Sequence, residues 1–585
     1  MSDFKHVCHY LKSIEEENSR ILMTNICAEL LRNFPDKENI DKLIYFMQGL
    51  LRPKFEGIEF GIGDKYIIQS ASIAYGYDVK HVEKLYKDLG DLGFMAEKLC
   101  NERKQLPLVT KELSISYIYD TCLQISKISG KGSLDLKIKR FAELLGYASP
   151  LEARYLARYP TGHMRLGIGD PTLLDAISVV VSSSKELREE VERYYNLTSD
   201  LGRVAKFYLS DKKIQELTNA IVYFSPVRPA LAERVSSINE IIDKQERFGI
   251  EFKYDGIRLQ IHKKGQEIKI FSRNQEDITR MFPDLCKELR EMQLDFVVEG
   301  ECLGYDEKEK KFLPFQVTVQ RKRKYGIEEK AKEIPIYVFM FDMLKINNED
   351  LIDRPYWERR MYLEKHFKNY SKMITVSDLF YPKDVNDIKK LFEKSIELGL
   401  EGIMSKNLDA KYTAGARKYA WIKLKKSYGE SVDSIDCVVV GTFKGQGQRV
   451  AQEFGGLLCC IYNDEKGRYE TIAKVSSGLS ESEYEEFGKR LSEIKLKKRP
   501  KEVFSLLEPD YWVELKYVVE LGFDEITISD VHTCGMDEIN EKKGYALRFP
   551  RLLRIRDDKS VDEITTYSEV INLFKLQSKK KLHKS

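Results

Sequence analysis

The sequence predicts a multidomain protein in which an all-α domain is followed by an α+β domain and then by a β domain. Up to about residue 215, apolar residues recur every three or four positions, which is typical of packed helices. From 250 to 426 strand-like runs alternate with helical ones. Later strand-like runs recur between glycine turns, as in a small barrel.

The helical prediction is clearest in "ILMTNICAELLRNF", residues 21–34. Two sets of apolar residues there are spaced so that they form one helix face: Leu22, Ile26 and Leu30, and Met23, Cys27, Leu31 and Phe34. Further helical stretches follow, and the chain of 585 residues is long enough for several domains of about 100–200 residues.

One loop in the helical part can meet an anion. In "HMRLGIGDPTLLDAI", Gly167 and Gly169 loosen the backbone, Asp170 is a good N-cap and Pro171 suits the first helical turn. These residues place free helix amides beside Arg165, where a phosphate can bind. The same residues also fit an ordinary capped helix start, and the sequence leaves both readings open.

The second part begins where Pro226 and Pro229 interrupt the helical pattern, so we expect a boundary near 216–225. The strand-like runs after it are "DFVVEGECLGYD", "IPIYVFMFDML", "LGLEGIMSK" and "YAWIKLKK". After "SYGESVDSID" the runs become shorter: "CVVVGTF", "GGLLCCIYN", "YETIAKV" and "YVVELGF". We therefore expect domains at 1–215, 216–427 and 428–585, the last ending in a basic tail.

Composition favours a folded protein of a reducing compartment. Apolar residues make up 42% and charged residues 32% of the chain, which is unlike a disordered segment, and the net charge of +3 indicates no particular partner. The ten cysteines form no C-x-x-C pair, which disfavours a disulfide framework or zinc ribbon. We find no signal peptide and no apolar run of about 18 residues, so we expect a soluble intracellular protein.

The stretch "EFKYDGIRLQIH", residues 251–262, raises the question of chemistry. Lys253 lies on a short strand and is followed by an Asp-Gly turn and by Arg258. A lysine on a strand often only faces water. As a nucleophile it needs a neutral amine, and for a nucleotide phosphate it also needs cations, metal-binding carboxylates and a flat apolar surface for the base.

The later strands offer each of these groups in turn. Glu299 and Glu301 alternate so that they share a face, and so do Phe339 and Phe341. The remaining candidates are Arg273, Glu401, Lys406, Lys423 and Lys425. Two lysines side by side on one face repel each other unless an anion lies near, which favours a polyanionic ligand. Each motif alone is more often structural, and the completeness of the set indicates a site.

Taken in order, "KYDGIR", "FSRNQED", "EGECLGYD", "VFMFDML", "EGIMSK", "WIKLKK" and "ALRFPRLLRIRDDK" resemble the motifs of the ATP-dependent DNA ligases. That family belongs to the covalent nucleotidyltransferase superfamily, and the resemblance covers essentially the whole chain. It implies an all-α DNA-binding domain of the archaeal and eukaryotic replicative type, an α+β nucleotidyltransferase (adenylation) domain and a β OB-fold domain.

The resemblance implies a role for each matching residue. Lys253 would take AMP as a phosphoramidate, Glu251 would face the adenine amino group and Phe341 would stack on the ring. Arg258 and Arg273 would contact the ribose and phosphates or the 5′-phosphate of a nick. The other implied contacts are Glu301 with ribose or metal, Glu401 with metal, Arg417, Lys423 and nearby Lys425 with the ATP phosphates, and Arg554, Arg556, Asp557 and Lys559 with pyrophosphate.

The implied cofactors are ATP and Mg²⁺ or Mn²⁺, and the implied partner is nicked double-stranded DNA, contacted in part through Arg165, Gly167 and Gly169. AMP would pass from ATP to Lys253 and then to the 5′-phosphate, and the 3′-hydroxyl would close the nick, in replication, repair and recombination. A hinge near Gly429–Asp433 would let the last domain close over ATP and later over DNA. We expect a monomer with no membrane contact, located in the cytoplasm of a prokaryote or the nucleus of a eukaryote.

Some features depart from the family pattern. Glu299 stands where aspartate is common, and Ala230 where methionine is often found. A sliding-clamp peptide is weakly indicated at Gln105–Leu108, because "KQLPLV" lacks an aromatic pair. The alternatives are a capping guanylyltransferase or RNA ligase, which share Lys-x-Asp-Gly, and a non-catalytic scaffold, which the intact set of motifs disfavours. The absent cysteine-rich module disfavours an NAD-dependent ligase.

Overall fold

The structure is a computed structural model of the 585-residue chain. It describes every residue except 1–2, 105–110, 211–220, 236, 307, 309–310, 314, 322–325, 426–432, 445–454, 537–542 and 583–585. The backbone alone is described at 315–316, 417, 433, 481, 576 and 578–582. The predicted clamp peptide at Gln105–Leu108 and nearly all of the predicted hinge from Gly429 therefore lie outside the described residues.

The described chain forms two compact units, Met1–Arg228 with Gln275–Asp277, and Pro229–Asn274 with Ile278–Ser585. The first unit extends to Arg228, beyond the expected boundary near 215, and the second contains the α+β and β parts together. The limits of the three domains remain a prediction.

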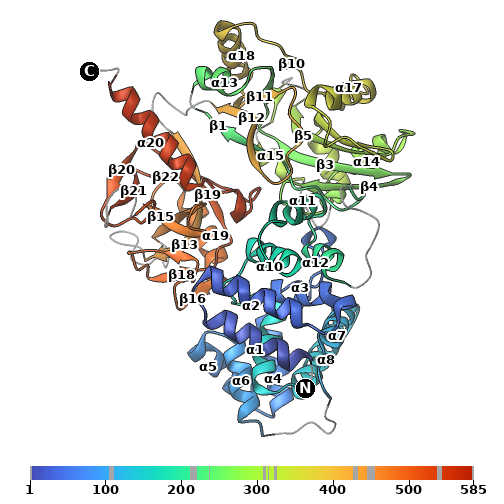
Figure 1. The fold of residues 1–585 in the computed structure, drawn as a ribbon, viewed down its shortest axis with the longest axis vertical. Coiled ribbons are helices and arrows are strands. Elements are labelled where there is room, and N and C mark those ends of the chain that lie inside the picture. The colour runs from blue at the N-terminus through green and yellow to red at the C-terminus, as the bar shows by residue number, and fades with distance from the viewer. Residues whose placement is uncertain are drawn as a thin grey trace. The chain divides into compact units, whose positions relative to one another are not determined.

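In the described part of Met1–Arg228 the regular elements are all helices, as predicted (Figure 1). Its helices are α1 (Asp3–Glu16), α2 (Arg20–Asn33), α3 (Ile40–Gln48), α4 (Asp64–Tyr75), α5 (Val79–Leu89), α6 (Leu92–Asn101), α7 (Ile115–Lys127), α8 (Ser133–Tyr147), α9 (Pro150–Arg158), α10 (Asp170–Ser182), α11 (Arg188–Thr198) and α12 (Leu201–Leu209). Short 3₁₀ turns lie at Lys37–Asn39, Lys54–Glu56 and Tyr159–Thr161.

Helix α2 shows how the apolar pattern and the packing agree and differ. Ser19 caps its first turn by accepting the N–H of Leu22. Met23, Cys27 and Leu31 are buried as predicted. Leu22 is 49% exposed, so its expected place on the buried face is wrong.

The α+β part of the second unit contains two sheets. The five-stranded sheet has the order β1-β12-β11-β2-β10 and consists of β1 (Leu231–Arg234), β2 (Phe248–Lys253), β10 (Leu379–Phe380), β11 (Gly402–Asn407) and β12 (Arg417–Lys425). The seven-stranded sheet has the path β4-β3-β5-β7-β8 and consists of β3 (Ile257–Lys264), β4 (Glu267–Ser272), β5 (Phe296–Asp306), β6 (Lys311–Phe312), β7 (Ile336–Ile346), β8 (Glu349–Asp350) and β9 (Ile374–Val376).

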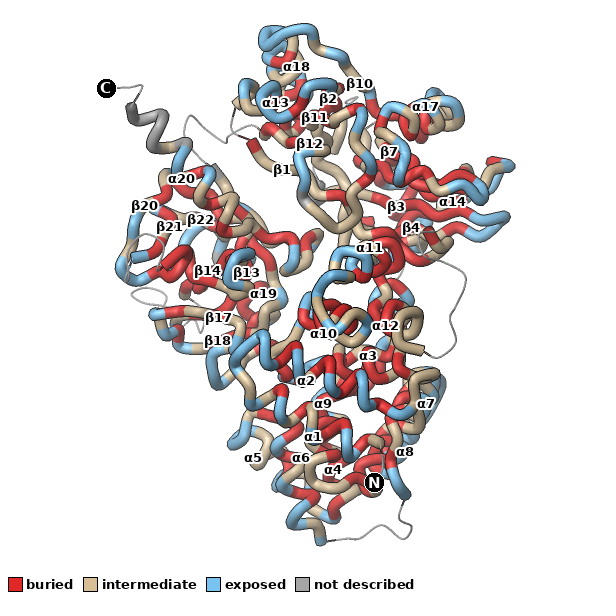
Figure 2. Tube along the Cα trace, in the orientation of Figure 1, coloured by how far each residue is buried: buried red, intermediate tan, exposed pale blue. Residues whose placement is uncertain are grey.

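Helices cover these sheets, and the strands of both sheets are largely buried (Figure 2). The helices are α13 (Ile238–Lys244), α14 (Pro283–Arg290), α15 (Phe315–Val319), α16 (Ile327–Glu333), α17 (Tyr356–Phe367) and α18 (Val385–Glu397). Each sheet has its own apolar core, one around Ile250, Ile403 and Ile422 and the other around Leu259, Val298 and Val338.

The last part is mainly β, as predicted. An eight-stranded sheet contains β13 (Asp433–Phe443), β14 (Gly456–Asn463), β15 (Arg468–Val475), β16 (Lys495–Leu496), β17 (Val503–Phe504), β18 (Tyr511–Val513), β19 (Val518–Phe523) and β22 (Arg551–Ile555). A hairpin of β20 (Glu525–Ser529) and β21 (Gly544–Arg548) and the helices α19 (Glu481–Ser492) and α20 (Tyr567–Leu582) complete it. In the parts of the chain that are described, no helix has the length and apolarity needed to cross a bilayer.

The chain passes from one sheet to the other at the Lys-x-Asp-Gly motif. β2 ends at Lys253 and β3 begins at Ile257 in the second sheet. Gly256 lies so close to β5 that a Cβ atom there would be 2.4 Å from the carbonyl oxygen of Cys302. The motif thus needs a glycine for close packing, and it places Lys253 where the two sheets meet.

Candidate active site

Backbone pairing brings Lys253 and Glu401 together. Lys253 pairs with Gly402 of β11, and the N–H of Glu401 donates to the carbonyl of Lys253 at 3.0 Å. The two side chains form an ion pair, with 19% and 16% of their surfaces exposed. The strand end thereby fixes a carboxylate directly against the candidate nucleophile.

Glu401 collects two further cations. Lys425 Nζ lies 3.2 Å from its carboxylate and Arg554 Nη2 lies 3.5 Å from it. Burial alone would raise the pKa of Glu401, but Lys253 and Lys425 outweigh it and hold the pKa well below its usual range. Glu401 is therefore a carboxylate near neutral pH.

Glu299 and Glu301 lie on one face of β5, as their spacing predicts, and both influence Arg258. Arg258 Nη2 donates to Glu299 at 2.8 Å, and Arg258 Nη1 donates to the carbonyl of Ala230 at 3.1 Å. Burial raises the pKa of Glu301 to about 7, although Lys253 and Arg258 oppose the shift. Glu301 and Glu401, the two carboxylates near Lys253, are a suitable oxygen donor set for Mg²⁺. This ion is usually held by one or two carboxylates together with substrate phosphates.

No cluster of three or more metal-ligating side chains occurs among the residues that the structure describes. Because Mg²⁺ is usually held by one or two carboxylates together with substrate phosphates, Glu301 and Glu401 fit a metal that is shared with a substrate.

A buried network surrounds Glu251, which is 3% exposed. Its carboxylate accepts from Tyr356 and Arg360 of α17, from Ser377, and from Lys406, whose Nζ is 2.9 Å away. Phe341 is half-buried nearby. The Phe341 ring lies edge-to-face with Trp421 at 5.8 Å, and Lys406 Nζ lies 4.6 Å from its centroid.

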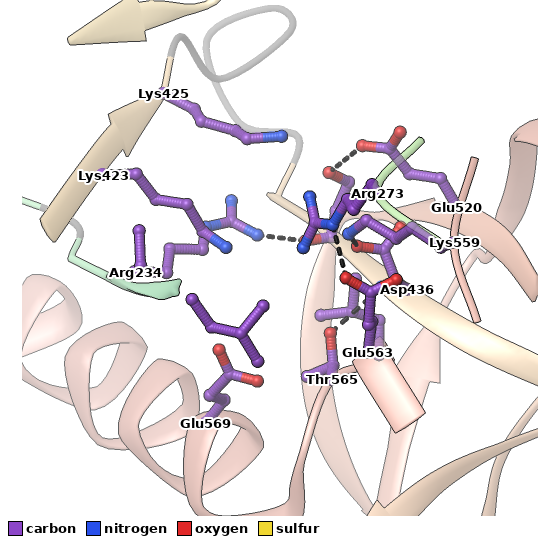
Figure 3. Close-up of a pocket in the computed structure, with 14 residues that line it drawn as sticks. Arg234, Arg273, Lys423, Lys425, Asp436, Glu520, Lys559, Glu563, Thr565 and Glu569 are labelled. Atoms are coloured by element: carbon purple, nitrogen blue, oxygen red, sulfur yellow. Dashed lines mark hydrogen bonds and ion pairs between the residues drawn. The ribbon is translucent and has the colours of Figure 1, made fainter. Parts of the chain in front are cut away.

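Four of the cations predicted to contact phosphate or pyrophosphate line one pocket of the second unit (Figure 3). They are Arg273, Lys423, Lys425 and Lys559, and Arg234 of β1 joins them. The carboxylates of Asp436, Glu520 and Glu563 lie beside Arg273 and Lys559, across the pocket from Lys423, Lys425 and Arg234, and Glu569 also lines it. Arg273 forms an ion pair with Glu563. The backbone of Arg417 lies on β12, but its side chain is outside the described set, so its predicted role remains open.

The last motif is held by acids of the β part. Arg554 Nε donates to Glu520 at 2.7 Å, and its guanidinium also lies 3.6 Å from Asp255. Arg556 Nη1 lies 3.2 Å from Asp436, which also pairs with Lys559.

Burial lowers the pKa of Lys559 to about 8, although Asp436 opposes the shift. Asp557, which was expected to act with these cations, is exposed and pairs with Arg490, while its neighbour Asp558 holds Arg556 at 2.6 Å. The structure therefore does not bring Asp557 into the pocket.

In the first unit, Arg165 lies in the loop before α10. It has a left-handed φ of 56°, and its guanidinium contacts Asp91 at 3.1 Å and the carbonyl of Gly90 at 3.3 Å. Gly167 also has a positive φ, of 72°.

The expected Asp170 N-cap is wrong, because Gly169 caps α10 and Asp170 is already helical. The Asp170 carboxylate instead accepts from Gln48 at 2.8 Å and from Tyr195, so packing against other helices takes the side chain away from the cap. Pro171 lies in the first turn, as expected.

Sequence reasoning missed the residues that hold the matched motifs in place. Tyr356, Arg360, Ser377, Asp436 and Glu520 all contact a motif residue and lie outside the motifs themselves. The only signal available was a charged or polar residue in an apolar strand or helix pattern, as for Asp436 before "CVVVG". Such a residue needs a buried partner, but the sequence does not identify that partner.

The fold and site together point to a class of protein: a nucleotidyltransferase with a lysine at the junction of two sheets, a buried aromatic and acidic network and a cation-lined pocket. Comparison with known proteins defines the family. Three family models match the chain: the DNA ligase N terminus at residues 3–178, the ATP dependent DNA ligase domain at 229–425 and the ATP dependent DNA ligase C terminal region at 450–559.

Relatives that align with this chain over nearly their whole length are also named DNA ligases. A probable DNA ligase of Dictyoglomus turgidum is 42% identical over 99% of this chain and 98% of its own length. A DNA ligase of Sulfurisphaera tokodaii is 39% identical over 99% of this chain and 98% of its own length. A solved mycobacterial DNA ligase D complexed with ATP and MES is 22% identical, covers 58% of this chain and 97% of its own, and has a TM-score of 0.35, too low to add to the assignment.

The chain belongs to the ATP-dependent DNA ligases. It is an enzyme that uses ATP and a divalent metal ion to seal nicks in DNA through an adenylate intermediate, as this family does.

Proposed function

We propose that Lys253 is the residue that becomes covalently adenylated. The observation that carries this assignment is its place at the end of β2, where the backbone hydrogen bond from Glu401 and the ion pair with the same residue fix its position. Lys253 Nζ attacks the α-phosphate of ATP, the bond to the β-phosphate oxygen breaks and pyrophosphate leaves. A proton must leave the amine, and the Glu401 carboxylate that contacts Nζ is placed to accept it.

The other site residues position charge. Lys423, Lys425, Arg273 and Lys559 neutralise the phosphate oxygens and orient the pyrophosphate leaving group. Glu301 and Glu401 are the residues that would hold the divalent metal, which supplies further charge neutralisation at the phosphates when bound. Arg417 is proposed for the same phosphate-binding role on its motif alone.

At the other end of the nucleotide, Glu251 accepts a hydrogen bond from the amino group of adenine, and Phe341 stacks on the face of the adenine ring. The support is that both residues lie in one network beside Trp421 and Lys406, with Glu251 ion-paired to Lys406. Arg258 is held by Glu299 and lies near Glu301, which suits a contact with ribose or with the 5′-phosphate of the nick.

After adenylation, AMP passes to the 5′-phosphate of the nick and the 3′-hydroxyl then displaces it. The loop with Arg165, Gly167 and Gly169 contacts the DNA backbone, and the positive φ of Gly167 and the exposed part of Arg165 support this. We also propose that the enzyme acts in the cytoplasm, at the nucleoid, because the relatives come from Dictyoglomus and Sulfurisphaera. We further propose that it is a monomer. Size-exclusion chromatography with light scattering tests the monomer.

The test of Lys253 is labelling with ATP that is radioactive at the α-phosphate. Lys253→Ala should abolish the covalent label, whereas Lys264→Ala, an exposed lysine on the adjoining β3, should keep it. Lys253→Ala should still close a nick that already carries AMP on its 5′-phosphate, because the final attack comes from the 3′-hydroxyl. Label retained by Lys253→Ala would show that another residue carries the AMP.

A further inference from the structure

Helix α17 contributes two side chains to the Glu251 carboxylate. The hydroxyl of Tyr356 and the Nη1 of Arg360 both donate to Oε1 of Glu251, the latter at 3.3 Å. Tyr356 is fully buried and Arg360 nearly so. Neither residue belongs to the motifs that the sequence matched, and both come from a helix rather than from the sheets that carry the motifs.

The donors are unequally divided between the two oxygens of Glu251. Among the described residues, Oε1 receives Tyr356, Arg360 and Lys406, whereas Oε2 receives only the hydroxyl of Ser377, at 3.1 Å. A carboxylate oxygen can accept about two hydrogen bonds, so Oε2 keeps acceptor capacity while Oε1 is saturated. The network therefore decides which oxygen can accept a further donor.

The same network fixes the aromatic residue proposed for the base. The Tyr356 hydroxyl, whose single proton is shared with Oε1 of Glu251, lies 3.1 Å from the carbonyl oxygen of Phe341, and Lys406 Nζ donates to the same carbonyl at 3.2 Å. The residue proposed to meet the edge of the base and the residue proposed to meet its face are thus tied together through Tyr356 and Lys406.

Two cations lie against the Glu251 carboxylate. Lys406 and Arg360 are both within ion-pair distance of it. Burial and the neighbouring Glu251 raise the pKa of Tyr356 well above its usual value, so its hydroxyl remains a donor. An ionised carboxylate cannot donate a hydrogen bond, and it therefore repels a base edge that presents an oxygen.

We propose that Tyr356 is a specificity-determining residue, which holds Glu251 as a pure acceptor for the 6-amino group of adenine and against the 6-oxo group of hypoxanthine or guanine. This inference rests on the proposed contact of Glu251 with the base. In this proposal Tyr356 does not contact the nucleotide. It acts through Glu251 and Phe341 and is therefore a positioning residue. Ser377 holds Oε2 in the same way.

Tyr356→Phe tests this, because it removes one hydroxyl and leaves the ring. The measurement is kcat/KM for formation of the lysyl-nucleotide with ATP and with ITP, whose bases differ only at the 6-position and the protonation of N1. The ratio of ATP to ITP should fall about tenfold, mainly through loss of ATP use, because one buried hydrogen bond orients the discriminating group. Tyr362→Phe, on the same helix and outside the network, should leave the ratio unchanged.

Closure of a nick already carrying AMP needs no free nucleotide and reports whether the variant is folded. An equal fall with ATP and ITP, or no change in their ratio, overturns the proposal. If Tyr356→Phe does not close the pre-adenylated nick, Ser377→Ala replaces it, with the same fall in ratio expected and the same results contradicting it. Absence of label in the wild-type enzyme would instead contradict the proposed function itself, so the two failures are distinct.

Discussion

The two ends of the nucleotide site are built differently. At the base end, Glu251 of β2 is surrounded by Tyr356 and Arg360 of α17, by Ser377 and by Lys406 of β11, and all of these residues are buried. At the phosphate end, cations of the α+β part lie opposite carboxylates that follow the undescribed residues 426–432. One end is complete within a continuous folded part, and the other is assembled from two parts of the unit.

The difference indicates what each end must do during the reaction. A nucleobase is the same in every turnover, so a satisfied network that holds one acceptor suits it. A triphosphate must enter and pyrophosphate must leave, and the cations of Arg273 and Lys559 already have carboxylate partners in Glu563 and Asp436. Those carboxylates occupy the cations until the phosphate oxygens replace them.

The largest effect should come from Glu401→Gln, which removes the charge shared by Lys253, Lys425 and Arg554. Formation of the lysyl-adenylate should slow by about 10²–10³-fold, because three cations lose their common counter-charge at the reacting atom. The ATP-to-ITP ratio should not change, since the base end is intact. A rate within about twofold of wild type would remove Glu401 from the chemistry.

Asp436→Asn should slow the adenylation step much more than the later steps of the reaction. Arg556 and Lys559 lose the carboxylate that aligns them, so adenylation by ATP should fall by about 10- to 100-fold. The rate at which the variant closes a pre-adenylated nick should fall much less. Glu470→Gln, a matched change of a buried acid on β15 that pairs with Arg468, should leave the balance between the two steps unchanged. An equal fall in the rates of both steps would indicate that Asp436 has only a structural role.

Lys559 predicts a pH limit for the first step. Its pKa is lowered by burial to about 8, so adenylation should decline as pH rises through 8, by about tenfold for each unit above it. In the unfolded chain its pKa stays near 10.5, so between pH 8 and 10.5 the unfolded state binds more protons and this group makes folding more stable as pH rises. Unfolding caused by this group therefore cannot produce the decline.

The check is the pH profile of adenylation for the wild type and for Lys559→Arg, since arginine stays charged throughout this range. The variant should lose the alkaline decline even if its rate at pH 7 is lower. A decline that persists unchanged in Lys559→Arg would assign it to another group.

The smallest effect is expected from Glu563→Gln. Burial alone raises the pKa of Glu563, but Arg273 outweighs it and lowers the pKa, so the carboxylate is ionised and competes with phosphate for Arg273. Neutralising it should lower the KM for ATP by roughly two- to fivefold, as expected for a partly exposed ion pair. A higher KM would mean that Glu563 helps to position Arg273 and does not compete with the nucleotide.

The strands that carry the motifs could be predicted from sequence, because alternation of apolar residues is a local property. "DFVVEGECLGYD" corresponds to β5 and "IPIYVFMFDML" to β7, each within a few residues. The errors lie where local preference meets packing. Leu22 follows the helical apolar spacing but is exposed, and Asp170 is a good cap residue but bonds to Gln48 instead.

The sequence by itself determined which residues carry charge or aromatic surface at the site, because residue type and strand alternation are written directly in "KYDGIR", "EGECLGYD" and "WIKLKK". Only the tertiary structure decided which partners those residues have. Tyr356 and Glu251 are 105 positions apart, and Lys559 and Asp436 are 123 apart. A local pattern holds no information about contacts at such separations, since they arise when sheets and helices pack against one another and each buried charge must find a counter-charge or hydrogen bond.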